Sequence, residues 1–406
     1  MSEKETQEKE TECQVESTTQ SIVSKAQELE KFKSEPKPKR RWKKIVFWTI
    51  FIVVNAGAIT FTMLSDFLGG GDNIYTSAMG ELLSQNWWWF LIAIASMFLW
   101  FLCMTLSFCV TTKFFTGKPR LALSASTIMI GQFYSKVTPL GAGAQPFQVH
   151  HMQRKKIEDG PAITLPIMEY AVSQFAFALI SVIAIILNAT NVFGSTITMN
   201  IGIYIAAAIG VALNAGLPLL IIISMFSKKA CSGITRFVAR TAKFLRLTKD
   251  PDRMYDRVMI KLEKNSECLK LLIKRKRLIL CFLLSIGSKL ALASVGFFVL
   301  KAFGFQAEHS WGWAEIVVLN LLITNAVSFI PTPGNSGAID LSFYWVYSVA
   351  LLATTGVASG ALATLIWRII VFYIPIVIGF THIMIINHRF KRKELISNRS
   401  PEGTLV

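Results

Sequence analysis

Long apolar runs are the feature that most limits what this chain can fold into. A helix needs about 20 consecutive apolar residues to cross the hydrocarbon core of a bilayer. Runs near that length lie at about 45–64, 87–110, 162–187, 201–225 and 278–300. Hydrophobic residues make up 52% of the 406 residues and charged residues only 17%, whereas soluble chains carry about 25% charge. The pattern excludes a soluble enzyme, a disordered protein and a secreted disulfide scaffold, and it predicts an all-α integral membrane protein.

Four further apolar segments complete the membrane domain, which we place at 45–387. Segment 121–146 is flanked by basic residues on both sides, so a single full crossing does not fit it, and we predict a re-entrant hairpin or a broken helix pair there. The others lie at 314–330, 339–356 and 357–386. We expect about eight transmembrane helices plus one or two re-entrant or broken pairs. Whether 314–356 crosses twice or re-enters stays open.

The charged segments orient the chain. Residues 1–44 begin as an acidic tail that we expect to be disordered, and end in a basic block beside the first apolar run. Residues 226–277 carry sixteen lysines or arginines against five acidic residues, with apolar residues at helical spacing, and 388–406 begin with a basic run. The positive-inside rule places all three in the cytoplasm, where basic amphipathic helices would lie on the anionic inner leaflet. The net charge of +17 therefore indicates lipid rather than nucleic acid.

Two similar motifs interrupt apolar segments in the two halves of the chain. Residues 138–144 read TPLGAGA and residues 332–338 read TPGNSGA, with four of seven positions identical. Proline removes a backbone donor and glycine allows positive φ, so each motif should break a helix. Paired broken helices are typical of transporters built from inverted repeats, whose helix ends face the substrate near the midplane. The alternative is two structural kinks that bind nothing.

Four charged residues fall inside apolar segments: Glu169, Lys289, Asp340 and Arg368. Left unpaired, four such charges would cost about 10–14 kcal/mol on insertion scales, so they must pair or face a wet cavity. An arginine can bind a phosphodiester with two hydrogen bonds, but an internal Arg–Asp or Lys–Glu pair without ligand is equally compatible with the sequence. Lys136, beside the first break, could extend to the interface instead.

The residues around both breaks also resemble a known family. GQFYSKVTPLGAGAQPFQ (131–148), FIPTPGNSGAIDLSFY (329–344) and IWRIIVFYIPIVIG (366–379) are similar to signature stretches of the lysylphosphatidylglycerol synthase transmembrane family, the flippase-like membrane region of bacterial multiple peptide resistance factors. The resemblance covers about 40–390. Two positions depart from the family pattern: Gly334-Asn335 stands where Gly-Gly is usual, and Asp340 where Glu is usual.

This resemblance implies a stand-alone flippase-like protein of the bacterial plasma membrane, with both termini cytoplasmic, that moves a phospholipid such as lysyl-phosphatidylglycerol between leaflets and thereby supports resistance to cationic peptides. The alternatives are a phosphatidylglycerol lysyltransferase, for whose soluble domain we expect no room, and a membrane partner of a separate lipid synthase. We expect no catalytic residue, metal or cofactor, and the sequence does not give the oligomeric state. The expected substrate-binding residues are Thr138, Pro139, Gly141, Gly143, Gln145, Thr332, Pro333, Gly334, Asn335, Ser336, Gly337, Asp340, Arg368, Glu169 and Lys289.

Overall fold

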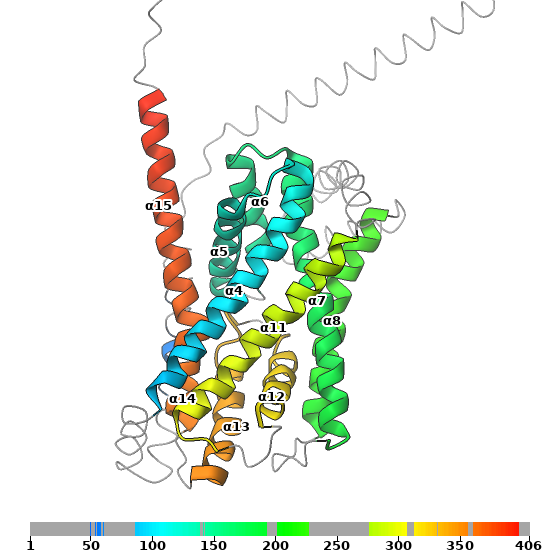
Figure 1. Ribbon diagram of the computed structural model, residues 1–406, viewed down its shortest axis with the longest axis vertical. Coiled ribbons are helices and arrows are strands. Elements are labelled where there is room, and N and C mark those ends of the chain that lie inside the picture. The colour runs from blue at the N-terminus through cyan, green and yellow to red at the C-terminus, as the bar shows by residue number, and fades with distance from the viewer. Residues whose placement is uncertain are drawn as a thin grey trace, which may run out of the picture. The chain divides into compact units, whose positions relative to one another are not determined.

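The protein is described from a computed structural model of the chain (Figure 1). The chain divides into units 1–50 and 51–406, and every element named below belongs to the second. The predicted tail at 1–44 and most of the predicted first span at 45–64 lie outside the described residues. So do residues 227–275 of the predicted basic segment at 226–277 and residues 398–406 of the predicted tail at 388–406. The structure describes residues 49, 53, 55–57, 60, 86–138, 141, 143–192, 201–226, 276–306, 312–330, 332–355 and 360–397.

The elements of the described part are helices, so the predicted all-α membrane fold is confirmed. Six of the described helical segments are long and apolar enough to cross a membrane, and their outward faces carry large apolar side chains that lipid would cover. The elements are α4 (Trp87–Thr116), α5 (Leu121–Val137), α6 (Ala144–Arg154), α7 (Asp159–Ala189), α8 (Ile201–Phe226), α11 (Arg277–Ala302), α12 (Gly312–Ala326), α13 (Ala338–Thr355), α14 (Gly360–Arg368), η1 (Ile369–Tyr373) and α15 (Ile374–Ser397).

Helices α4 and α11 run side by side through the centre of this unit (Figure 1). The hydroxyl of Ser96 on α4 donates to the carbonyl of Ala291 on α11 at 2.7 Å. Around this pair lies the largest apolar cluster, to which α12, α13 and α14 also contribute; its fully buried members include Phe303, Leu319 and Phe343. Helix α4 also packs against α5 and helix α11 against α12, so each of the two contacts one helix of a broken pair.

The first predicted break separates α5 from α6. Thr138 ends α5 in an extended conformation, Gly141 has φ +67°, and α6 begins at Ala144. The Thr138 hydroxyl accepts a hydrogen bond from the Gly143 N–H at 2.9 Å and lies 2.6 Å from the carbonyl oxygen of Tyr134. The side chain thereby satisfies a backbone donor that the interruption frees, which a bilayer could not do.

The second predicted break separates α12 from α13. Three of the four residues 334–337 in the turn have positive φ values: Gly334 at 60°, Asn335 at 54° and Gly337 at 90°. The Thr332 hydroxyl donates to the Ser336 carbonyl at 3.1 Å, so the threonine that the two motifs share stabilises the loop in both copies. Asp340, in the first turn of α13, accepts from the Gly337 N–H at 2.9 Å, which caps that helix.

The two broken pairs lie at opposite ends of the long helices, α5–α6 at the upper end in Figure 1 and α12–α13 at the lower end. This arrangement is the one expected of an inverted repeat. The 15 residues of α12 extend about 22 Å, less than the hydrocarbon core of about 30 Å, whereas the 18 residues of α13 reach the length of a crossing. The last predicted span is one continuous helix, Gly360–Phe390, with a π-helical turn directly after Arg368.

Candidate functional site

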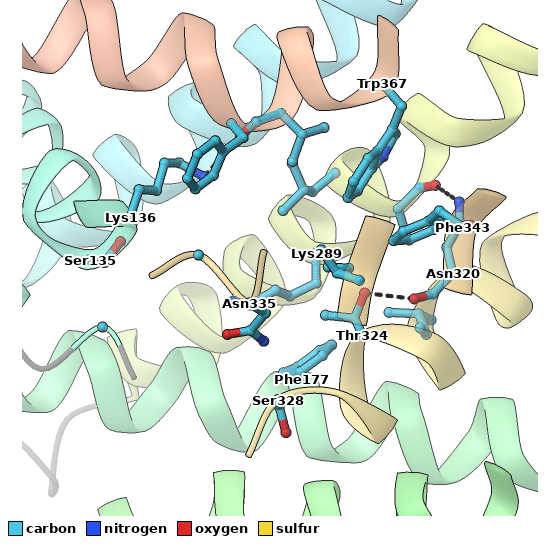
Figure 2. Close-up of a pocket in the computed structure, with 18 of the residues that line it drawn as sticks. Ser135, Lys136, Phe177, Lys289, Asn320, Thr324, Ser328, Asn335, Phe343 and Trp367 are labelled. Carbon is cyan, nitrogen blue, oxygen red and sulfur yellow. Dashed lines mark hydrogen bonds between the residues drawn. The ribbon is translucent and has the colours of Figure 1, made fainter. Parts of the chain in front are cut away.

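A cavity of about 330 Å³ lies where the two breaks meet. Gly141 of the first break lines it together with Gly334 and Asn335 of the second. In Figure 2, Lys136 approaches from one side, Phe343 and Trp367 close the opposite side, and Lys289 and Asn335 lie between them. The volume lies within the range of small-ligand sites, about 300–1,000 Å³. Two motifs almost 200 residues apart in sequence therefore share one cavity.

The cavity lies beside the middle of three long helices. Three of its polar side chains come from helices that are long and apolar enough to cross the bilayer: Gln174 from α7, Asn214 from α8 and Lys289 from α11. Each stands within one residue of the midpoint of its helix. Lys289, for example, is about 18 Å of helix from the start of α11. A ligand in this cavity would therefore lie beside the middle of these helices.

Arg368 joins the cavity to the second break. Its Nε lies 3.2 Å from an Asp340 carboxylate oxygen, and both side chains are buried. Its two terminal nitrogens donate to the Gly334 carbonyl at 3.3 Å, and one also reaches the Ser336 hydroxyl at 2.5 Å. The guanidinium carbon lies 4.1 Å from the centre of the Phe372 ring. The Arg–Asp pair that the sequence allowed is thus present, and Arg368 lines the cavity as well.

Two lysines supply further positive charge. Lys136 does not extend to the interface: its ammonium donates to the Val371 carbonyl in η1 at 2.8 Å and lies 5.6 Å from the centre of the Phe372 ring. The Lys289 ammonium lies 5.2 Å from the centre of the Phe177 ring. Within the described part of the chain, neither lysine forms an ion pair, so the Lys–Glu pair that the sequence allowed is not formed as a salt bridge.

Glu169 lies behind the cavity lining. One carboxylate oxygen accepts from the Ser107 hydroxyl at 2.8 Å, while the other is buried without a hydrogen-bond partner among the described residues. Glu169 is close enough to Lys289 for their charges to attract each other. It therefore compensates part of the Lys289 charge at a distance without entering the cavity itself.

The amide and hydroxyl lining was missed by sequence reasoning, which searched the apolar runs only for charges. Gln174 donates to the Asn214 amide oxygen at 3.4 Å, and Asn214 donates in turn to Asn325 at 3.3 Å and to Ser328 at 3.2 Å. Asn320 donates to the Ala293 carbonyl at 2.8 Å. Amides near the middle of apolar runs are the signal that would have found these residues, since an unsatisfied amide is costly there.

The predicted site residues fall into two groups. Those that line the cavity are Gly141, Lys289, Gly334, Asn335 and Arg368. Those that do not line it are Thr138, Gly143, Gln145, Thr332, Pro333, Ser336, Gly337, Asp340 and Glu169. Pro139 lies outside the described residues. Among the residues described, no group of three or more His, Cys, Asp or Glu is placed to hold a metal ion.

Broken helix pairs around a polar cavity, within a set of long apolar helices, define a multi-pass membrane protein. The family model described as the lysylphosphatidylglycerol synthase TM region matches residues 72–379, which is more than half of the chain and includes both breaks. The chain belongs to this family. No curated protein matched the chain.

Proposed function

We propose that this protein translocates a phospholipid between the leaflets of the bacterial plasma membrane, with both termini in the cytoplasm. Family membership supports a lipid-related membrane protein. The observation that carries the finer proposal is the cavity between the two breaks, lined by three cationic side chains and by amides at the midpoints of two long helices. A lipid headgroup that crosses the bilayer needs such polar partners, because the hydrocarbon core provides none.

The positions of the two broken pairs are compatible with a cavity that is exposed to one leaflet at a time. Each pair of short helices enters from its own end of the long helices, and each contributes backbone to the cavity (Figure 1). Small movements of one pair against the other could open the cavity to either leaflet, as in transporters with inverted repeats. Lys136 links α5 to the turn after Arg368, so its bond to Val371 is one contact that such a movement would have to break.

Leaflet exchange in liposomes tests the proposal. The full chain is reconstituted with fluorescent phosphatidylglycerol, and dithionite quenching measures how much of the probe reaches the outer leaflet. We expect quenching of both leaflet pools with protein and of one pool in protein-free vesicles. Equal quenching in the two preparations would refute translocation, and formation of lysyl lipid from lysyl-tRNA would favour the transferase alternative.

A matched pair of variants ties exchange to the cavity. Thr324→Phe places a ring in the cavity, whereas Thr190→Phe places the same ring on an exposed helix end; both hydroxyls bond to the carbonyl four residues earlier. We expect the first variant to exchange lipid at the rate of protein-free vesicles and the second at the wild-type rate. Thermal unfolding of both purified proteins checks that they fold.

A further inference from the structure

We propose that the cavity selects a headgroup whose charges are all negative, such as the phosphodiester of phosphatidylglycerol, over an aminoacylated headgroup that carries ammonium groups. The inference rests on the proposed function for the identity of the ligand as a lipid. It departs from the expectation that the family resemblance raised, which was a lysyl-phosphatidylglycerol substrate.

The described lining carries three cations and no carboxylate. Both nearby carboxylates stand behind it: Asp340 is bound by Arg368 and the Gly337 N–H, and Glu169 by the Ser107 hydroxyl. With both carboxylates counted, the described site keeps one net positive charge. The charged groups that a headgroup would touch in the described lining are all cations. Because like charges repel each other, the cations of the lining would disfavour the ammonium group of an aminoacylated lipid.

Lys289 is the cation most available to a ligand. Among the described residues it has no hydrogen bond and no ion pair within salt-bridge distance; the Phe177 ring lies 5.2 Å from its ammonium, and Glu169 attracts its charge from behind the lining. Lys136 is held by one neutral carbonyl and by aromatic rings, which a phosphate oxygen could replace. The charge of Lys136 also repels those of Lys289 and Arg368. An anion placed among the three would relieve that repulsion and gain charge-assisted hydrogen bonds.

The amides of the lining are neutral and leave the charge count unchanged. Two of their oxygens already accept hydrogen bonds, that of Asn214 from Gln174 and that of Asn320 from the Tyr347 hydroxyl. An anion needs donors, and the lysine ammonium groups supply them. The expected preference therefore follows from the charges of the lining.

Binding to the purified full chain in detergent tests the selectivity without any transport. Equilibrium dialysis would compare short-chain phosphatidylglycerol, its lysyl derivative and inorganic phosphate. We expect phosphatidylglycerol to bind at least about tenfold more tightly than the lysyl lipid. Lys289→Gln should remove most of that ratio, Lys289→Arg should restore it, and Lys301→Gln, on the same helix but outside the cavity, should leave it unchanged. If Lys289→Gln does not fold, Lys136→Gln takes its place.

The outcomes separate the two proposals. Equal or tighter binding of the lysyl lipid, or a ratio that Lys289→Gln does not change, would overturn the selectivity even if liposomes exchange lipid. Selective binding without leaflet exchange would keep the selectivity and refute translocation. If inorganic phosphate displaces phosphatidylglycerol at similar concentration, the phosphate alone supplies the recognised chemistry; if it does not, the ligand is the lipid.

Discussion

Removing the charge of Asp340 should strongly destabilise the second break. Its carboxylate accepts from Gly337 through one oxygen and lies 3.2 Å from Arg368 Nε through the other, with both side chains buried. At that distance, an effective dielectric constant of about 20 gives an attraction of roughly 5 kcal/mol. Desolvation offsets part of this attraction in the wild type, but a charge left alone is not compensated. We therefore expect Asp340→Asn to lower the free energy of unfolding by about 3–5 kcal/mol.

A double-mutant cycle isolates the pair from the other contacts. Arg368→Met alone leaves Asp340 as the buried charge and should cost a similar amount, whereas the double variant should cost at least about 2 kcal/mol less than the sum of the singles. Asp340→Ala should cost about 1 kcal/mol more than Asp340→Asn, because the cap on Gly337 is lost as well. Asp159→Asn, on the exposed first turn of α7, is the control and should change stability by less than about 0.5 kcal/mol.

Detergent titration of the full chain in mixed micelles, followed by the fluorescence of its 10 tryptophans, measures these free energies. Each single variant should unfold at a clearly lower concentration of denaturing detergent than the wild type, and the double variant should lose less stability than the sum of the two single losses. Additive effects, or a cost of Asp340→Asn no larger than that of the control, would show that the pair does not hold the break and would refute the reasoning.

Two further substitutions test other parts of the structure. Gly334→Ala should lower the free energy of unfolding by more than about 2 kcal/mol, because φ is +60° and the new Cβ would lie 2.0 Å from the Phe372 ring. Gly117→Ala is the control: φ is +71° but the surrounding space is open, so it should cost only about 1–2 kcal/mol. Unfolding titrations compare the two variants, and equal costs would contradict a packing clash at Gly334. Asn325→Leu removes the buried amide that binds Ser181 at 2.7 Å and should cost about 1–3 kcal/mol in the same titration, with no loss arguing against the amide network.

The breaks could be predicted because their chemistry is local. Proline, glycine and the shared threonine determine where a helix ends within a few residues, and the helices stop at Thr138 and restart at Ala144 and Ala338 where the motifs lie. The intramembrane charges could also be found from sequence, since any lysine or arginine inside an apolar run stands out.

The partners of these charges could not be predicted, because they depend on packing between distant helices. Lys136 bonds to a carbonyl 235 residues later, and that carbonyl belongs to a π-helical turn that no sequence pattern indicated. From the sequence, a Lys289–Glu169 pair was as plausible as the Arg368–Asp340 pair. In the structure the Ser107 hydroxyl binds the Glu169 carboxylate, while Lys289 lines the cavity. Only the arrangement of α4, α7 and α11 decides between these alternatives.

The central claim is that the two breaks enclose the place where a lipid headgroup binds. Cryo-electron microscopy of the full chain in phosphatidylglycerol nanodiscs would test it most directly. We predict density for a phosphate group inside the cavity, bounded by Gly141 and Gly334 and within hydrogen-bonding distance of the Lys289 ammonium. Lipid density confined to the outer surface, with the cavity closed by its own side chains, would contradict the account.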